Sequence, residues 1–153
     1  MGCFLTGQVG AMTHIVGRSF GWRIPANISF YQDWAKPKNF TAGDKLVFLY
    51  TTDLHNVLEV KKEDYDACTH KHVINKYDSG PTIFEVTKPG DHYFICGLKN
   101  NCQSGQKLSI SVMKGNTSSG GGLFGLIFKS SANSRHNIGM LSGLLLVLIN
   151  LLI

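Results

Sequence analysis

Residues 92–96 read HYFIC, residues 97–106 read GLKNNCQSGQ, and residues 107–112 read KLSISV. The first and last of these runs are rich in β-branched and aromatic residues, and the last alternates polar with apolar side chains. Such alternation is the period-2 pattern of a strand with one buried face. This stretch therefore predicts two β-strands, joined by a polar loop that folds back.

The same signature recurs along the chain. Runs rich in β-branched and aromatic residues, bounded by turn residues, occupy 14–16, 45–50, 56–60 and 82–86. Residues 62–67 favour a helical turn, and we predict no helix of greater length. About six short strands within about 100 residues are typical of an all-β Greek-key sandwich or barrel. We predict that fold class, with short helical turns and an apolar C-terminal tail. Trp22, Trp34 and Phe40 are expected in its core.

Composition excludes several classes of protein. The chain has 153 residues, of which 43% are hydrophobic and 16% charged, which argues against overall disorder and against a coiled coil. Its net charge of +5 is scattered without a run of Lys or Arg, so a nucleic-acid-binding protein is not expected. The sequence has no HExxH motif, phosphate-binding Gly loop or Ser/His/Asp spacing, so no enzyme is predicted.

The C-terminal part of the chain resembles an anchoring signal. Residues 115–137 are a Gly/Ser-rich stalk, and residues 138–153 are an uncharged tail of mostly Leu and Ile. The tail is short for a spanning helix, which needs roughly 20 apolar residues. Small residues followed by a polar spacer and an apolar tail signal a glycolipid (GPI) anchor. Ser130 or Ser131 is the predicted attachment residue, and a tail-anchored helix is the alternative.

The N-terminal residues carry conflicting signals. Gly2 and Cys3 match an acylation pattern, which would place the chain on the cytoplasmic side. We instead interpret residues 1–11 as the remnant of a signal peptide, because the C-terminal signal requires a secreted chain. Three sequons agree with secretion and predict glycosylation. They are at Asn27, Asn39 and Asn116.

The cysteines predict one bridge and one thiol with another role. With Cys3 assigned to the leader, Cys68, Cys96 and Cys102 remain in the folded part. In an oxidising compartment an odd number of cysteines implies one disulfide plus one further thiol. The spacing alone does not decide which two are joined.

Cys96 is placed as a metal-binding thiolate would be, at the end of an apolar strand beside a returning loop. A blue-copper centre uses one Cys, two His and a weak axial ligand. His55, which precedes an apolar strand, is a candidate for the distant ligand, with an ordinary surface histidine as an equal alternative. Gln106 offers an amide oxygen for the axial place.

Motifs spread from residue 12 to residue 113 carry a family resemblance. They are His14-Ile15-Val16-Gly17, Gly21-Trp22, Tyr31-Gln32-Asp33-Trp34-Ala35, Phe40-Thr41-Ala42-Gly43-Asp44, Tyr77-Asp78-Ser79-Gly80, Gly90-Asp91-His92-Tyr93-Phe94-Ile95-Cys96 and Cys102-Gln103-Ser104-Gly105-Gln106-Lys107-Leu108. Together they resemble the plant phytocyanins, which are extracellular cupredoxin-fold proteins, often glycolipid-tethered, with copper-carrying and copper-free members. The resemblance implies a phytocyanin domain over residues 12–114.

The resemblance also implies specific pairings and roles. It implies a Cys68–Cys102 disulfide, and it makes His55, Cys96 and Gln106 copper ligands, with Gln106 in the axial place of the stellacyanin type.

One position departs from the family pattern. Where the family has its second histidine ligand this chain has Asn101, and a neutral amide is a far weaker donor to copper than imidazole. His92 is not expected to substitute, because four strand residues separate it from Cys96 by roughly 13 Å. His70 and His72 are less favoured alternatives.

The resemblance implies single-copper electron transfer, with a compromised type 1 site, by a protein tethered to the outer face of the plasma membrane. A redox partner or a cell-wall component, a membrane contact through the lipid anchor, and a monomeric state are expected. The alternative function is a copper-free early-nodulin-like module that binds cell-wall glycans or proteoglycans, to which the +5 charge lends weak support. The alternative location is the apoplast, or a membrane reached by a tail anchor.

Overall fold

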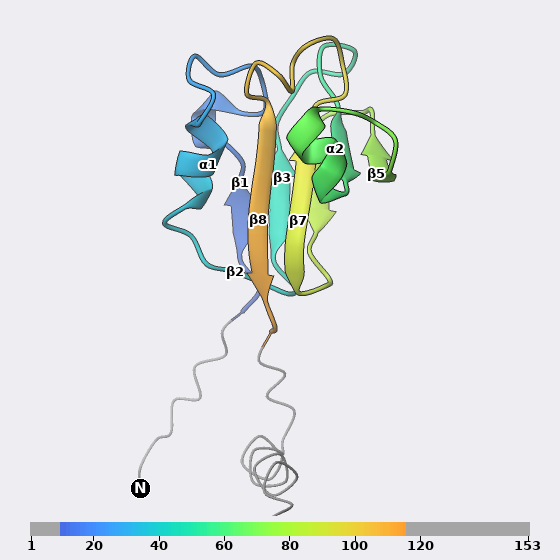
Figure 1. Ribbon diagram of the computed structural model, residues 1–153. Coiled ribbons are helices and arrows are strands. Elements are labelled where there is room, and N and C mark those ends of the chain that lie inside the picture. The colour runs from blue at the N-terminus through green and yellow to red at the C-terminus, as the bar shows by residue number, and fades with distance from the viewer. Residues whose placement is uncertain (1–9, 116–153) are drawn as a thin grey trace, which may run out of the picture. The chain divides into compact units, whose positions relative to one another are not determined.

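The computed structural model of the protein describes residues 10–115. Figure 1 shows the strands packed as a sandwich, with the short helices α1 and α2 flanking strand β8. The elements are β1 (Thr13–Ile15), the 3-10 helix η1 (Arg18–Phe20), α1 (Phe30–Ala35), β2 (Phe40–Thr41), β3 (Lys45–Phe48), β4 (Val57–Val60), α2 (Lys62–Ala67), β5 (Val73–Tyr77), β6 (Thr82–Glu85), β7 (Gly90–Ile95) and β8 (Lys107–Met113).

Within the described residues the strands form two sheets, in the orders β1-β3-β6 and β2-β8-β7-β4-β5. The β1–β3 and β2–β8 pairs are parallel, and the other pairs are antiparallel. Alternate side chains face the core, as Leu46 and Phe48 do on β3 and Leu108, Ile110 and Val112 do on β8. The predicted all-β sandwich is confirmed.

The aromatic residues expected in the core are buried there. Trp22 is fully buried and packs edge-on against Phe48, with ring centroids 5.0 Å apart. Trp34 and Phe40 are also buried, and they lie in contact with each other. The indole N–H of Trp22 donates a hydrogen bond to the carbonyl of Asn56, 2.9 Å away. The core thus anchors the residue that follows His55.

The sequence pattern does not predict α1, β2 or β5. Helix α1 is only six residues long, and it is stabilised by burial of Tyr31, Trp34 and Ala35, which share one face at helical spacing. Strand β2 has two residues. Strand β5 lies at the edge of the larger sheet and is exposed at all residues except Tyr77, so it lacks the alternation that marks the other strands.

Several predicted features lie outside the described residues. These are residues 1–9 of the leader, the sequon at Asn116, the anchor residues Ser130 and Ser131, and the tail 138–153. The sequons at Asn27 and Asn39 lie at exposed positions. Between residues 10 and 115, the structure has no helix of the length and apolarity needed to cross a membrane.

Candidate metal centre

Three neighbouring strands of the larger sheet position the candidate ligands. Strands β8, β7 and β4 lie side by side, Gln106 directly precedes β8, Cys96 directly follows β7, and His55 lies two residues before β4. The backbone N–H of Cys96 donates to the carbonyl of Gln106 at 3.0 Å, which extends the β7–β8 ladder. The strand order therefore places these three side chains at one end of the sandwich, where the loop between β7 and β8 lies (Figure 1).

His55, Cys96, Asn101 and Gln106 form one cluster. The Nδ1 atom of His55 lies 3.2 Å from Oε1 of Gln106 and 3.4 Å from Nδ2 of Asn101. The same Nδ2 donates a hydrogen bond to Sγ of Cys96, 3.4 Å away. The structure thus brings together all four residues that sequence analysis placed at the ligand positions.

The cluster is buried except at His55. Cys96, Asn101 and Gln106 are buried, whereas His55 is partly exposed. Burial lowers the pKa of His55, the hydrogen bond with Gln106 acts to raise it, and the positive charge of Arg23 lowers it further. An imidazole with a lowered pKa stays neutral at neutral pH and keeps a lone pair for a metal ion. Nε2 of Gln106 is buried without a hydrogen-bond partner among residues 10–115.

A disulfide fixes the loop that carries Asn101. Cys68 and Cys102 are bridged, with Cα atoms 5.7 Å apart, so the predicted pairing is confirmed. Among the cysteines that the structure describes, Cys96 is the free one. Asn101 directly precedes Cys102. Its backbone N–H donates to the carbonyl of Leu98, and its carbonyl accepts from the N–H of Gln106. The loop therefore has little freedom to redirect the Asn101 side chain.

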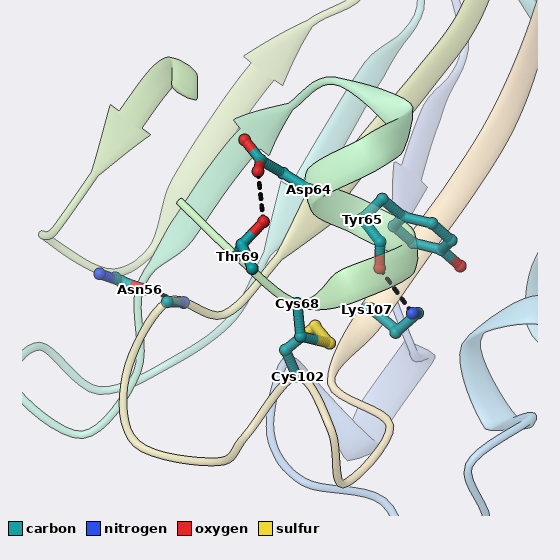
Figure 2. The surroundings of a disulfide bond; sticks show 8 residues. Asn56, Asp64, Tyr65, Cys68, Thr69, Cys102 and Lys107 are labelled. Atoms are coloured by element: carbon teal, nitrogen blue, oxygen red, sulfur yellow. Dashed lines mark hydrogen bonds between the residues drawn. A yellow bond between two sulfur atoms is a disulfide. The ribbon is translucent and has the colours of Figure 1, made fainter. Parts of the chain in front are cut away.

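Helix α2 supports this loop from the side. Figure 2 shows the disulfide beside the C-terminal end of α2, with the Nζ atom of Lys107 donating to the carbonyl of Tyr65. That distance is 2.7 Å, and the Lys107 ammonium also lies 4.2 Å from the centroid of the Tyr65 ring. In the same view the Thr69 hydroxyl donates to the buried carboxylate of Asp64. These contacts fix α2 against the start of β8, next to Gln106.

Asn56 is a site residue that sequence reasoning missed. Its Oδ1 atom accepts the backbone N–H of Gly97 at 2.8 Å and lies 3.7 Å from Sγ of Cys96. Its Nδ2 atom donates to Asp78 at 3.2 Å. Gly97 packs against Leu58, because a Cβ there would lie 2.4 Å from Cδ1 of Leu58 and would require that side chain to move. The one sequence signal for Asn56 is its position next to His55.

His92 and His72 have partners outside the cluster, whereas His70 lies beside Gly97, the residue that follows Cys96. Both ring nitrogens of His92 face acceptors outside the cluster, the Glu59 carboxylate at 2.8 Å and the Lys88 carbonyl at 2.7 Å. His72 faces Asp64 at 3.7 Å, and the ring of His70 lies close to Gly97.

The cluster contains amides where a metal centre usually has stronger donors. No group of three or more His, Cys, Asp or Glu side chains suited to a metal ion occurs in residues 10–115. The cluster is not such a group, because it contains only one histidine and one cysteine. Its other two members are the amides of Asn101 and Gln106.

Comparison with known proteins places this geometry in context. A family model described as a plastocyanin-like domain matches residues 22–106. The chain is 40% identical to the cucumber peeling cupredoxin of Cucumis sativus, over 67% of this chain and 77% of that protein. It is 34% identical to early nodulin-like protein 9 of Arabidopsis thaliana, over 72% of this chain and 56% of that protein.

Solved structures agree with the sequence matches. A structure of cucumber stellacyanin with Cu²⁺ at pH 7.0 has a TM-score of 0.64 and 38% identity, covering 70% of this chain and 99% of that one. The cupredoxin-like fold and the phytocyanin resemblance are thereby confirmed.

Proposed function

Because this chain belongs to the plant phytocyanin family, we propose that it is a single-copper electron-transfer protein outside the cell. The contact between His55 and Gln106, beside the free thiol of Cys96 in a buried cluster, is the observation that carries the proposal. When bound, a copper ion would supply one-electron chemistry between Cu(II) and Cu(I). We expect no enzymatic activity.

The donor set fits a copper ion in part. Cys96 offers a soft thiolate, His55 a neutral imidazole, and Gln106 a weak amide oxygen of the kind found in the axial place of blue-copper centres. Gln106 is fully buried, and its Oε1 atom lies 3.2 Å from Nδ1 of His55, which supports a role for the amide oxygen in metal binding. Asn101 leaves the set one strong donor short.

The chain's own residues also supply a rigid frame and a contact face. The hydrogen bond that Asn56 accepts from Gly97 and the Cys68–Cys102 bridge hold the loops that carry the donors, which would keep rearrangement between oxidation states small. Leu54, beside His55, is 63% exposed, and Ile28, whose backbone lies against Gly105, is 74% exposed. We propose that a redox partner docks beside His55, against the exposed side chain of Leu54, onto a monomer of this protein.

Copper binding is tested by metal content. The purified protein is mixed with copper in each oxidation state and desalted, and the copper per chain is then measured. We expect one ion per chain in the wild type, loss of that ion in Cys96→Ser, and no change in the matched control His72→Gln, whose side chain faces Asp64. Equal copper content in wild type and Cys96→Ser would contradict the assignment.

A second function is favoured by Asn101 itself. If the protein binds neither Cu(I) nor Cu(II), the replacement of the second histidine by Asn101 points to a copper-free structural or signalling module that contacts cell-wall glycans or proteoglycans. The sandwich would then serve as a surface, and binding to acidic polysaccharide would be independent of Cys96.

We also propose that the protein is held at the outer face of the plasma membrane by a GPI anchor. The support is the sequence of residues 115–153, with Ser130 or Ser131 as the attachment residue and residues 138–153 removed. Exposure of the Asn27 and Asn39 sequons is compatible with glycosylation in the secretory pathway. Phosphatidylinositol-specific phospholipase C should release the protein, and retention together with the C-terminal peptide would indicate a tail anchor.

A further inference from the structure

We propose that this centre holds Cu(I) in preference to Cu(II), because Asn101 acts as a hydrogen-bond donor to the Cys96 thiolate and not as a metal ligand. The inference rests on the proposed copper binding and specifies the oxidation state that the site selects. It concerns a residue at which this chain departs from the family pattern.

The orientation of Asn101 is the first step. Its Nδ2 atom faces both Sγ of Cys96 and Nδ1 of His55, each at 3.4 Å. An amide NH₂ group donates hydrogen bonds and offers no lone pair to a metal ion. When copper holds Cys96 as a thiolate, the reverse orientation would point the amide oxygen at a negatively charged sulfur, which repels that oxygen and attracts an N–H.

The surroundings hold Asn101 in that position. The residue is 5% exposed, its backbone is hydrogen-bonded to Leu98 and Gln106, and the next residue, Cys102, is in the disulfide. A metal ion would therefore meet a preset donor rather than a side chain free to turn its oxygen inward.

The remaining donors favour the reduced ion. With Asn101 removed from the ligand set, Cys96 and His55 are the strong donors, and Gln106 adds a weak oxygen. Soft thiolate ligands select Cu(I), whereas Cu(II) binds best to several nitrogen and oxygen donors in a tetragonal arrangement. The N–H···S hydrogen bond also draws charge from the sulfur, and hydrogen bonding around this sulfur is one of the factors that tune the potential of such sites.

The test compares the two ions on the same chain. Affinity for Cu(I) is measured under nitrogen with ascorbate, by competition with a coloured Cu(I) chelator, and affinity for Cu(II) by competition with a Cu(II) chelator. The variants are Asn101→His, which adds an imidazole, and Asn101→Leu, which keeps the size of the side chain but removes the N–H donor. Labelling of Cys96 by a thiol reagent reports occupancy independently of colour.

We expect the wild type to bind one Cu(I) and to protect Cys96 from labelling. Asn101→His should tighten Cu(II) binding by at least about 100-fold, the upper end of what even outer-shell changes do to metal affinity, with a much smaller change for Cu(I). Asn101→Leu should retain Cu(I) and lower the reduction potential relative to the wild type.

Two failures are distinguishable. Wild-type binding of Cu(II) that is as tight as in Asn101→His would overturn this inference and leave the proposed function standing. Absence of binding in either oxidation state would overturn the proposed function itself. Should Asn101→His fail to give a wild-type circular dichroism spectrum, Asn101→Leu decides, because a potential that stays the same or rises contradicts the hydrogen-bond argument.

Discussion

The side chain of Asn56 accepts a hydrogen bond from the backbone N–H of Gly97 at 2.8 Å, and this contact joins the segment that carries His55 to the segment that carries Cys96. The amide is oriented from its other end, where Nδ2 donates to Asp78. Its backbone carbonyl is in turn held by the indole of Trp22. Asn56 therefore couples the hydrophobic core to the geometry of the cluster.

Replacing Asn56 with Leu should destabilise the protein by about 1–3 kcal/mol, because the Gly97 N–H then lacks its partner in a partly buried place. The free energy of unfolding in urea measures this loss, and faster labelling of the Cys96 thiol should accompany it. The matched control is Asp78→Asn, which keeps an acceptor for Nδ2 and should change stability far less. A wild-type stability for Asn56→Leu would show that the contact adds nothing.

Removing the disulfide should have a larger effect. Cys68 and Cys102 are 34 residues apart in the chain, and closing a loop of that length stabilises a fold by roughly 3–4 kcal/mol in the chain-entropy account. We expect the Cys68→Ser/Cys102→Ser double variant to lose about that much unfolding free energy. Cys96→Ser, which removes a thiol outside the bridge, is the control. Equal losses in the two variants would mean that the bridge has no special role.

The parts of the fold that the sequence predicts are those with strong local patterns. Strand β8 alternates over its whole length, and its pairing with β7 follows from the short return through residues 97–106. Strand β5 could not be found in the same way, because it is a sheet edge whose burial does not alternate. Helix α1 depends on packing of Tyr31 and Trp34 against the core, which a six-residue pattern does not reveal.

The candidate site was predictable as a set of residues but not as a set of contacts. The positions of Cys96, His55 and Gln106 along the chain indicated candidate ligands, and the resemblance to phytocyanins added Asn101. That the Asn101 amide donates to Cys96 depends on side-chain orientation, and that orientation follows from the Cys102 bridge and the loop hydrogen bonds. Asn56 has no pattern of its own, because its role arises from the register of β4 beside β7.

The pair of Glu59 and His92 should make stability depend on pH. Both ring nitrogens of His92 face acceptors, so only the protonated ring donates to both, and the hydrogen bond to Glu59 raises the pKa of His92 above 6.5. Burial acts to raise the pKa of Glu59, but hydrogen bonds from His92 and Asn75 outweigh it and hold that pKa below 4.5.

The directions of the two pKa shifts define the pH range in which the pair stabilises the fold. The His92 contribution is fully present below pH 6.5 and is lost as the pH rises through its raised pKa, whereas the Glu59 contribution is present above pH 4.5 and is lost as the pH falls through its lowered pKa. Between pH 6 and pH 9 the wild type should therefore lose more unfolding free energy than His92→Gln. At pH 6 that variant should be less stable by about 1.5–3 kcal/mol, the range for a hydrogen bond to a charged group. Parallel pH profiles for the two proteins would refute the charged pair.

The two tryptophans should respond differently to the same substitution. The indole N–H of Trp22 donates to the carbonyl of Asn56, whereas the buried indole N–H of Trp34 has no partner within residues 10–115. Changing either residue to Phe removes a similar apolar area, so the packing losses largely cancel in the comparison. Trp22→Phe additionally leaves a buried carbonyl unpaired, while Trp34→Phe removes a donor that was already unpaired.

We therefore expect Trp22→Phe to cost about 1 kcal/mol more than Trp34→Phe in urea unfolding. Trp22→Phe should also speed labelling of Cys96, because Asn56 loses its anchor. Equal losses, or a larger loss for Trp34→Phe, would contradict the assignment of Trp22 as the residue that ties the core to the cluster.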